Sequence, residues 1–595
     1  IYYQTYDVTS LITEKNAIAA IVGDGWYNSS IVGGSYGDKN AFIAKLVLIY
    51  EDGSEESIVT GDGWKYSSAG PVVSADFYDG EQYDARLEKS DMSLYGGCSD
   101  WQNAKVCTSP DLLMQGTFSP GVLTAEATEP VRKITAYRPI AVTNPEEGVY
   151  VYDFGQNMAG VVSVKMAGES GKSVTFTYGE YLNSETGKPE IGYMLGHNGT
   201  DTYIFRGETG GETFSPTLVY HGFRYLMIEG LAEAVKDGDI TAYMISNDTK
   251  RTGSFESSDA LLNRYYENTL MSQRSNFVSN LTDCPTREKN GWTGDAQIFA
   301  KTAAFNSDVR SLYGNFLEMM RSSMSDGGAV PEIIPSRGTS NTTKTPAGWS
   351  DAIVTIPYEL YMQYGNRDIL TENYDSMKAW ISYLLKYKLD PENGDYVRKD
   401  GNYGDHLAYN NGKENFGYSE KEYGGTGKDV VKRETSYSEI ATAYTAYSCS
   451  LISEIAEILE NADDAAYYKE LSGKFADAWR KNFLEEDGVT SKANSQTSYV
   501  MGLYFDLYES PEKKSAAADK LCALIESSDG CQTVGFIGIS YILDALSDNG
   551  KTDAAYKLLR NTKAPSLLYP VTMDATTTWE SYTGGSHNHY VQGSP

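Results

Sequence analysis

Hydrophobic and polar residues alternate in short runs over roughly the first 250 residues of the chain. Segments such as AFIAKLVLIYEDGS, KSVTFTYGEYL and GFRYLMIEG combine this alternation with Gly, Asp and Asn between the runs. A period of two places every second side chain on one face of a strand, and such breaks favour turns. The pattern therefore predicts antiparallel β-sandwich domains. A break near residues 118–130 divides them into two, at 1–125 and 126–252.

From about residue 255 the spacing of apolar residues changes to that of a helix. The segment SSDALLNRYYENTLMSQ begins with a serine that we expect to cap the helix, and it places Leu261, Leu262, Tyr265 and Tyr266 on one stripe. Similar stripes recur roughly ten times. Because stacked antiparallel helix pairs bury such stripes well, residues 253–595 are predicted to form a helical domain. The period alone does not decide whether the pairs close into a ring.

The charge balance narrows the kinds of partner. The 595 residues include 81 Asp and Glu against 50 Lys and Arg, which gives a net charge of −31. Nucleic acids and anionic membranes require a basic face, so neither is expected as a partner. The chain also has no apolar run of the length that crosses a bilayer. Its 47 tyrosines beside many carboxylates suit sugars, although most of these rings can simply pack in sheets.

Cysteine and histidine are sparse. Of the six cysteines, Cys98 with Cys107 and Cys522 with Cys531 could form disulfides, but free thiols are the expected state. His587 and another histidine two positions later would share one face of a strand, yet no third metal ligand is evident. We therefore expect neither a metal nor an organic cofactor.

The segment DCPTREKNGWTGD, residues 283–295, holds the densest group of candidate catalytic residues. It contains Asp283, Arg287, Glu288, Trp292 and Asp295 between two predicted helices, where functional side chains are often presented. Acid catalysis needs a carboxylic acid that stays protonated, and neighbouring carboxylates favour that form. Arg287 could bind a hydroxyl group, and Trp292 could cover an apolar face. A capped, salt-bridged structural loop is the alternative.

A second candidate lies in MDATTTWESYTGGSHNHY, residues 573–590, where Glu580 follows Trp579. On its own, a glutamate in this position is more often a surface residue than a catalyst. Glu288 and Glu580 are almost 300 positions apart, so only the fold could bring them together.

Both segments resemble the bacterial α-L-rhamnosidases. In that family the catalytic loop reads D-C-P-x-R-(D/E)-E-x-x-G-W-x-G-D or a variant, and the C-terminal motif reads G-A-T-T-x-W-E followed by N-H. The likeness extends over nearly the whole chain. Its further segments are, in order, YYQTYDVTSLI with GDGWYNSS, YVYDFGQNMAGVV, YHGFRYLMIEG, GWSDAIVTIPYELY and VGFIGISYILDAL. Together these segments are specific evidence for the resemblance, whereas a short segment such as GFRY alone would be weak evidence.

The resemblance implies N-terminal β-sandwich domains followed by an (α/α) six-hairpin toroid at 253–595. It implies inverting hydrolysis of terminal non-reducing α-L-rhamnose from glycans or glycosides, with Glu288 as general acid and Glu580 as general base. The residues that match the family's rhamnose pocket are Asp283, Arg287, Trp292, Asp295, Trp349 and His589.

The chain departs from the family pattern in several places. Asp405 and His406 stand where the family often has Asp followed by Trp, so stacking on the sugar or its aglycone is expected to differ. Asp574 replaces the usual glycine. The chain begins inside a β-domain and stops at Pro595, so we expect both terminal domains to be incomplete.

Two alternatives are kept. One is a toroid glycosidase for another sugar, and the other is a truncated, non-catalytic glycan-binding protein. The oligomeric state is unknown, and either the bacterial cytoplasm or secretion of a soluble protein is compatible with the sequence.

Overall fold

A computed structural model of the chain describes residues 2–29, 36–37, 39–107, 123–192, 194, 197–336, 344–389, 396–400, 402–410, 413–415 and 435–580. The chain divides into two compact units. The first comprises Ile1–Ala127, Lys133–Ile245 and Thr286–Glu288, and the second comprises Thr128–Arg132, Ser246–Pro285 and Lys289–Pro595.

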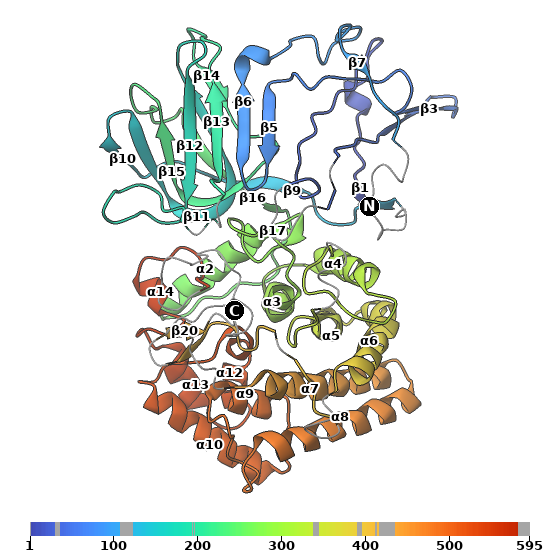
Figure 1. The fold of residues 1–595 in the computed structure, drawn as a ribbon, viewed down its shortest axis with the longest axis vertical. Coiled ribbons are helices and arrows are strands. Elements are labelled where there is room, and N and C mark those ends of the chain that lie inside the picture. Colours follow the sequence, from blue (N-terminus) through green and yellow to red (C-terminus); the bar gives the residue numbers. More distant parts are fainter. Residues whose placement is uncertain are drawn as a thin grey trace. The chain divides into compact units, whose positions relative to one another are not determined.

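The first unit is built on a ten-stranded sheet (Figure 1). Its strands are β5 Val72–Asp76, β6 Gly80–Asp84, β9 Val131–Tyr137, β10 Ala141–Glu146, β11 Val149–Met166, β12 Ser173–Gly179, β13 Thr200–Ile204, β14 Glu212–Phe214, β15 His221–Glu229 and β16 Ile240–Asn247. The main order is β5-β6-β13-β12-β15-β11-β16-β9, and β10 and β14 also pair with β11. Most neighbours are antiparallel, while β6 and β13 are parallel. The strands predicted at KSVTFTYGEYL and GFRYLMIEG are confirmed as β12 and β15.

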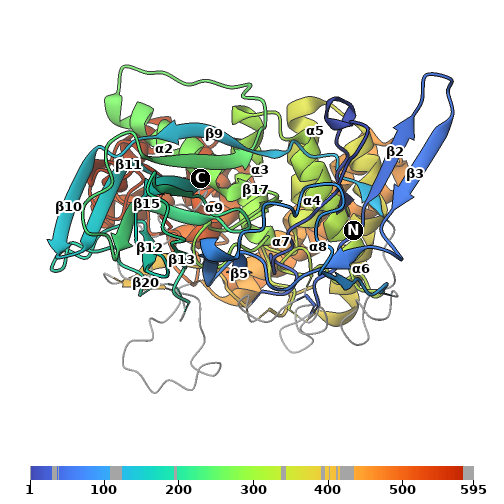
Figure 2. The same ribbon diagram turned by 90° about the horizontal axis from the view of Figure 1, so that it is seen from above.

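Shorter elements complete this unit. They are β1 Tyr2–Tyr3 with β8 Thr124–Ala125, β2 Lys45–Ile49 with β3 Glu55–Val59, β4 Lys65–Tyr66 with β7 Gln102–Asn103, and the 3-10 helices Thr9–Leu11 and Ala85–Leu87. The β2–β3 pair forms an antiparallel hairpin, seen in Figure 2. Because β5 and β6 join the sheet built mainly from residues 131–247, the domain boundary proposed near residue 125 stays a prediction.

The second unit is helical, as the apolar period predicts. Its helices are α2 Ala260–Asn276, α3 Thr293–Asn306, α4 Arg310–Ser323, α5 Ala352–Tyr364, α6 Asp368–Tyr387, α7 Tyr437–Ile458, α8 Ala462–Phe483, α9 Gln496–Tyr504, α10 Pro511–Ser527, α11 Phe536–Ile539, α12 Ile542–Ser547, α13 Thr552–Leu559 and α14 Tyr569–Thr572. Two short strand pairs accompany them, β17 Phe277–Val278 with β18 Asn280–Leu281, and β19 Ala408–Asn410 with β20 Lys413–Asn415.

Five of these helices form an inner series. Each of α3, α5, α7, α9 and α12 packs against the next. Lys301 of α3 pairs with Asp544 of α12 at 2.9 Å, so the first and last members also meet. Helices α4, α6, α8, α10 and α13 each pack against an inner member. This arrangement agrees with the expected helical toroid.

The start of α2 corrects one prediction. The N-cap residue is Asp259 rather than a serine, and its carboxylate accepts hydrogen bonds from the amides of Leu261 and Leu262 at 3.0 and 3.4 Å. The Ser257 hydroxyl instead bonds to the Asn263 side chain at 3.0 Å. Asp259 caps the helix because it directly precedes the first turn, whose amides lack partners within the helix.

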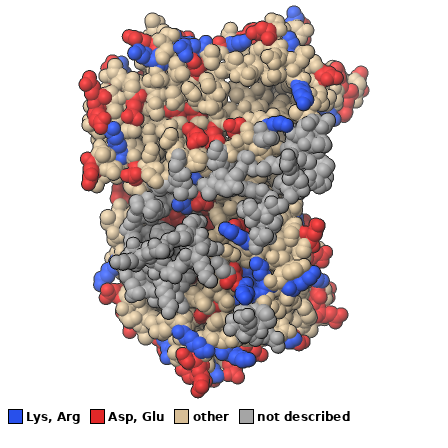
Figure 3. All heavy atoms as spheres, viewed as in Figure 1, with Lys and Arg blue, Asp and Glu red and all other residues tan. Residues whose placement is uncertain are grey.

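Four further observations concern the chemistry of the chain. All six cysteines are free thiols. Within the part of the chain that the structure describes, no helix combines the length and apolarity needed to span a bilayer, and no group of His, Cys, Asp and Glu side chains is arranged to hold a metal ion. On the described atoms of the face in Figure 3, acidic and basic side chains are interspersed.

Candidate active site

Glu288 lies in the loop between α2 and α3, as the sequence predicts. Its side chain is 15% exposed, and Oε1 accepts a hydrogen bond from Arg287 Nη2 at 2.7 Å. Residues 286–288 belong to the first unit, in which the Tyr78 hydroxyl donates to the backbone carbonyl of Glu288. One direct charged contact of Glu288 is therefore the guanidinium group of Arg287, and the predicted influence of neighbouring carboxylates stays a prediction.

Asp283 closes the turn that carries Glu288. Its Oδ1 accepts from the Asn290 amide at 2.8 Å, and its own amide donates to the Asn290 carbonyl at 2.9 Å. The Cys284 thiol lies 3.2 Å from Oδ2. Asp283 is 5% exposed, so much of its hydrogen-bonding capacity serves the loop. Its contact with a sugar stays a prediction.

Trp292 and Asp295 lie where the loop becomes α3. Trp292 is the N-cap residue, and Asp295 is in the first turn, where a carboxylate complements the helix dipole. Gly294 is inside the helix rather than in the loop, and a Cβ atom there would lie 2.5 Å from Nε1 of Trp349. A glycine is thus needed for Trp349 to pack on the start of α3.

Four aromatic side chains form a continuous series, which we call the aromatic row: Trp292, Tyr403, Trp349 and Phe536. Successive ring centroids are 5.7, 4.9 and 5.1 Å apart, and the rings of Trp349 and Phe536 are stacked at 19°. These distances are typical of favourable aromatic contacts. The sequence identified the two tryptophans but not Tyr403, which lies three residues before His406. An aromatic ring is therefore present near the site where the family's tryptophan is missing.

Asp405 anchors the far end of the aromatic row. Its buried carboxylate accepts from the amides of Gly535, Ile537 and Gly538 at 2.8, 2.9 and 3.1 Å, and from the Thr497 hydroxyl. Burial raises the pKa of Asp405, although these hydrogen bonds act in the opposite direction.

The next residue contributes to the same anchor. The backbone carbonyl of His406 accepts from the Phe536 amide at 2.7 Å. The Gly-Asp-His segment therefore positions Phe536.

Glu580 lines a pocket in the second unit. The space free of protein atoms in this pocket, including its open mouth, is ≈ 560 Å³. The lining residues are Tyr265, Asn268, Leu407, Gly535, Phe536, Ile539, Ser566, Leu567, Pro570, Val571, Thr577, Thr578, Trp579 and Glu580. Because Phe536 belongs both to this wall and to the aromatic row, the row that begins at Trp292 ends in the pocket of Glu580.

Helix α2 holds the segment that carries Glu580. Asn268 donates to the Ala575 carbonyl at 3.0 Å, and the Ser272 hydroxyl accepts from the Thr578 amide at 2.9 Å. Asp574 has a φ of 59°, in the left-handed region that favours glycine and is also open to aspartate. The aspartate thus keeps the turn that a glycine would form.

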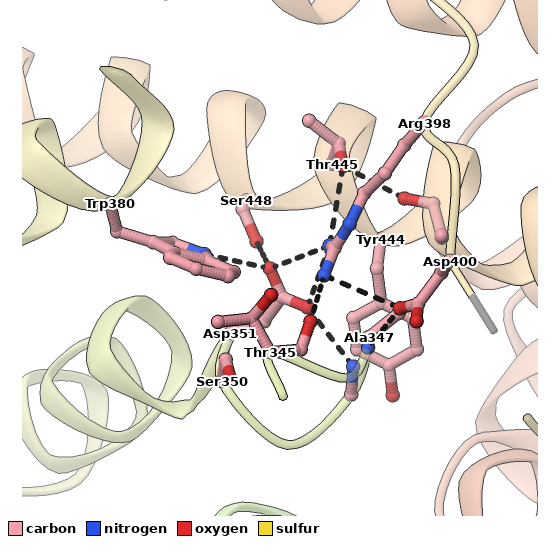
Figure 4. Close-up of polar contacts among 12 residues, drawn as sticks. Thr345, Ala347, Ser350, Asp351, Trp380, Arg398, Asp400, Tyr444, Thr445 and Ser448 are labelled. Carbon is pink, nitrogen blue, oxygen red and sulfur yellow. Dashed lines mark hydrogen bonds and ion pairs between the residues drawn. The ribbon is translucent and has the colours of Figure 1, made fainter. Parts of the chain in front are cut away.

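A buried charged network holds the loop of Trp349 (Figure 4). Asp351 is 0% exposed, and its carboxylate accepts from Trp380 Nε1 at 3.0 Å and from the Ser448 hydroxyl at 3.3 Å. The Arg398 guanidinium lies 3.3 Å from the Asp351 carboxylate.

Two further contacts of Arg398 reach the same loop. It donates to the Thr345 carbonyl at 2.9 Å and lies 3.6 Å from Asp400, which accepts from the Ala347 amide at 2.7 Å. The network therefore fixes residues on both sides of Trp349.

Glu332 is a buried acid beside the aromatic row that the sequence analysis did not single out. It is 3% exposed, and burial raises its pKa to about 7. The only signal in the sequence is one glutamate inside the otherwise apolar run AVPEIIP.

The structure connects some of the predicted site residues. It pairs Arg287 with Glu288, and it joins Trp292 to Trp349 through Tyr403. The predicted pocket residue His589, together with His587, lies outside the described residues.

Comparison with known proteins identifies the family of the chain. The model of the bacterial alpha-L-rhamnosidase six-hairpin glycosidase domain matches residues 250–595. The alpha-L-rhamnosidase N-terminal domain matches residues 1–134, and the bacterial alpha-L-rhamnosidase concanavalin-like domain matches residues 143–246.

Individual relatives agree with these matches. The chain is 35% identical to an α-L-rhamnosidase of Streptomyces avermitilis over 100% of its own length and 55% of the relative's. It is 33% identical to one of Alteromonas sp. (strain LOR) over 99% of its own length and 63% of the relative's. The crystal structure of Streptomyces avermitilis α-L-rhamnosidase complexed with L-rhamnose matches 96% of this chain and 52% of that chain, with a TM-score of 0.84 and 32% identity. The chain therefore spans between half and two thirds of these relatives.

Proposed function

Because this chain belongs to the bacterial α-L-rhamnosidase family, we propose that it hydrolyses terminal non-reducing α-L-rhamnose from glycans or glycosides. The observation that carries this proposal is the aromatic row of the second unit, which runs from Trp292 to the pocket that Glu580 lines. A similar protein was crystallised with L-rhamnose, which supports rhamnose as the sugar.

The proposed mechanism is inverting hydrolysis. Glu288 donates its proton to the glycosidic oxygen as the bond from that oxygen to the anomeric carbon breaks. Glu580 removes a proton from a water molecule, whose oxygen bonds to the anomeric carbon from the opposite face. Such enzymes hold their carboxyl groups roughly 6.5–9.5 Å apart to admit the water.

We assign sugar recognition to residues around these two acids. Asp283, Arg287, Asp295 and His589 would bind hydroxyl groups, and Trp292 and Trp349 would pack against the apolar face. A single methyl group in an apolar pocket contributes only about 1–3 kcal/mol of discrimination, so the hydroxyl contacts must supply most of the specificity. No metal or organic cofactor is proposed.

The test is hydrolysis of p-nitrophenyl α-L-rhamnoside by the purified chain, followed by proton NMR. The β anomer of L-rhamnose should form first and then mutarotate. An α anomer as first product would overturn the inverting mechanism. Nitrophenyl glycosides of other sugars form the control panel, and faster hydrolysis of one of them would favour a different toroid glycosidase. Calorimetric binding of rhamnose without turnover would favour a glycan-binding protein.

A further inference from the structure

Backbone contacts hold Glu332 directly beside Trp292, the first residue of the aromatic row. Its backbone carbonyl accepts from the Thr293 amide at 2.9 Å and from the Thr293 hydroxyl at 3.1 Å. The next residue, Ile333, forms an antiparallel bridge with Trp292. A Cβ atom added to Gly291 would lie 2.1 Å from the Ile334 carbonyl oxygen, so the two segments approach as closely as a glycine allows. Glu332 is thus held rigidly next to Trp292.

The carboxyl group of Glu332 interacts with the aromatic row. A side-chain hydrogen bond from Tyr403, the ring that lies between Trp292 and Trp349, lowers the pKa of Glu332. Its second oxygen, Oε2, is buried and has no hydrogen-bond partner among the residues that the structure describes. Tyr403 has a φ of 54°, a left-handed conformation that is unfavourable for a bulky side chain. Contacts of its side chain must therefore help to hold it there.

The charges around Glu332 leave it close to a change of protonation near neutral pH. Burial is the largest influence and raises its pKa to about 7. Asp400 acts in the same direction, whereas Lys344 and the hydrogen bond from Tyr403 lower the pKa. A hydrogen bond to an ionised carboxylate is roughly twice as strong as one between neutral groups. The ionised form of Glu332 therefore holds Tyr403 more firmly than the protonated form does.

We propose that Glu332 is a positioning residue of the sugar pocket, which fixes the Tyr403 ring between Trp292 and Trp349 through its hydrogen bond to the Tyr403 hydroxyl. The identity of the sugar rests on the proposed function, but the placement of the ring does not. The carboxyl group acts through Tyr403 and takes no part in bond cleavage.

The experiment compares the wild-type chain with Glu332→Gln, Tyr403→Phe and the double variant. L-rhamnose binding is measured by calorimetry at pH 6 and pH 8. Wild-type affinity should be about five-fold weaker at pH 6, where Glu332 is mostly protonated. At both pH values, each single variant should bind L-rhamnose with the affinity that the wild type has at pH 6. Neither should show the higher affinity of the wild type at pH 8. The double variant should be no weaker than either single variant, because both changes remove the same hydrogen bond.

Near-ultraviolet circular dichroism gives a readout that needs no sugar. The wild-type signal of the packed aromatic rings should change between pH 6 and pH 8, and this change should be lost in Glu332→Gln and in Tyr403→Phe. Glu439→Gln is the matched control, since Glu439 is 2% exposed, has a pKa raised to about 7, and bonds to Ser498 instead of the row. It should keep the wild-type response.

The outcomes separate the two proposals. If the pH-dependent circular dichroism signal is lost in the variants but no form of the protein binds rhamnose, the proposed function fails and the role of Glu332 stands. If rhamnose binds, multiplicative losses in the double variant would overturn the role of Glu332. The role of Glu332 would also be overturned if Glu332→Gln kept the full wild-type change in affinity and circular dichroism between pH 6 and pH 8.

Discussion

Glu288 and Asp283 are two acids of one loop with different surroundings, and substitution should separate their roles. Glu288 pairs with Arg287 and is the candidate general acid. We expect Glu288→Gln to retain rhamnose binding but to lose about 10²–10⁴-fold in turnover, the usual contribution of general acid catalysis. The loss should be smallest for a nitrophenyl leaving group, which needs little protonation. Steady-state kinetics on substrates with good and poor leaving groups checks this, and near-wild-type turnover on the poor one would exclude Glu288 as the acid.

For Asp283 the structure adds a loop contact to the predicted sugar contact. Asp283→Ala should lower the free energy of unfolding by about 1 kcal/mol, because the Asn290 amide loses its acceptor. Asp283→Asn can still accept that bond and should keep wild-type stability. Both variants should lose most of their turnover, since neither carries the charge proposed to bind rhamnose. Thermal unfolding measures the structural role of Asp283, and steady-state kinetics measure its role in binding the sugar. An active Asp283→Asn variant would show that Asp283 only stabilises the loop.

Single residues also show what the sequence can single out. Glu288 and Trp292 stand in a dense local motif and Trp349 matches the family pattern, while the roles of all three stay predictions. Tyr403 and Glu332 were missed because their roles depend on contacts across 71 residues of chain, which no local pattern records. Asp405 was noticed for the unusual residue after it, but its function as a fourfold hydrogen-bond acceptor became visible only in the folded loop.

At the scale of elements, the helical period predicted the long helices well. The apolar stripe of GISYILDALSDNG, residues 538–550, predicts one helix, but the structure has the end of α11 and then α12 there. Asp405 accepts hydrogen bonds from the first amides of α11 and so ties this short helix to another loop. The roughly ten apolar stripes of the sequence do not include α13 or α14. Both are short, and α14 contains a proline near its start.

The N-terminal turn of α7 should make stability depend on pH. Burial raises the pKa of Glu439 from 4.5 to about 7, so the folded state holds its proton more tightly than the unfolded state. This contribution to stability is complete below pH 4.5 and is lost as pH rises through 7. Glu439→Gln should therefore gain up to about 3 kcal/mol relative to wild type between pH 4.5 and pH 8. Urea unfolding at both pH values measures the gain, and an equal difference at both would contradict it.

Removing a charged partner from the buried network around Asp351 should lower the free energy of unfolding far more than removing a partner from a surface ion pair. Removing one partner of a buried ion pair typically costs about 3–5 kcal/mol, and we expect Arg398→Met to destabilise the helical unit by that amount. Arg367→Met is the control, because Arg367 and Glu460 are 51% and 83% exposed. That variant should change the free energy of unfolding by less than about 1 kcal/mol. Equal thermal shifts in the two variants would refute the structural role of the network.

At the scale of the whole molecule, closure of the inner helical series can be tested through its last contact. Lys301 and Asp544 are 45% and 44% exposed, so their pairing should be worth only about 0–1 kcal/mol. Lys301→Met should therefore leave the unfolding midpoint nearly unchanged, because packing of the apolar helix faces holds the series together. A loss of several kcal/mol in chemical denaturation would instead assign closure to the ion pair.

The sequence predicted a β-sheet region followed by a helical region, but it could not predict which strands pair or which helices meet in space. The charge of −31 argues against nucleic acids and anionic membranes as partners, but it says nothing about how elements pair. The parallel pairing of β6 with β13 and the meeting of α3 with α12 involve residues more than 100 positions apart. Such pairings depend on long-range packing, which periodicity does not encode.

The aromatic row also has a consequence for how the protein is made. Trp292 and Phe536 stand 244 positions apart, and a ribosome adding about 5–20 residues per second needs roughly 10–50 s to cover that distance. Once Trp349 has been added, both tryptophan rings are synthesised while Phe536, the ring that completes the stack, is still missing. A nascent chain released early would expose apolar rings that chaperones recognise, so translation pauses in this interval should lower the yield of folded protein more than pauses after residue 536.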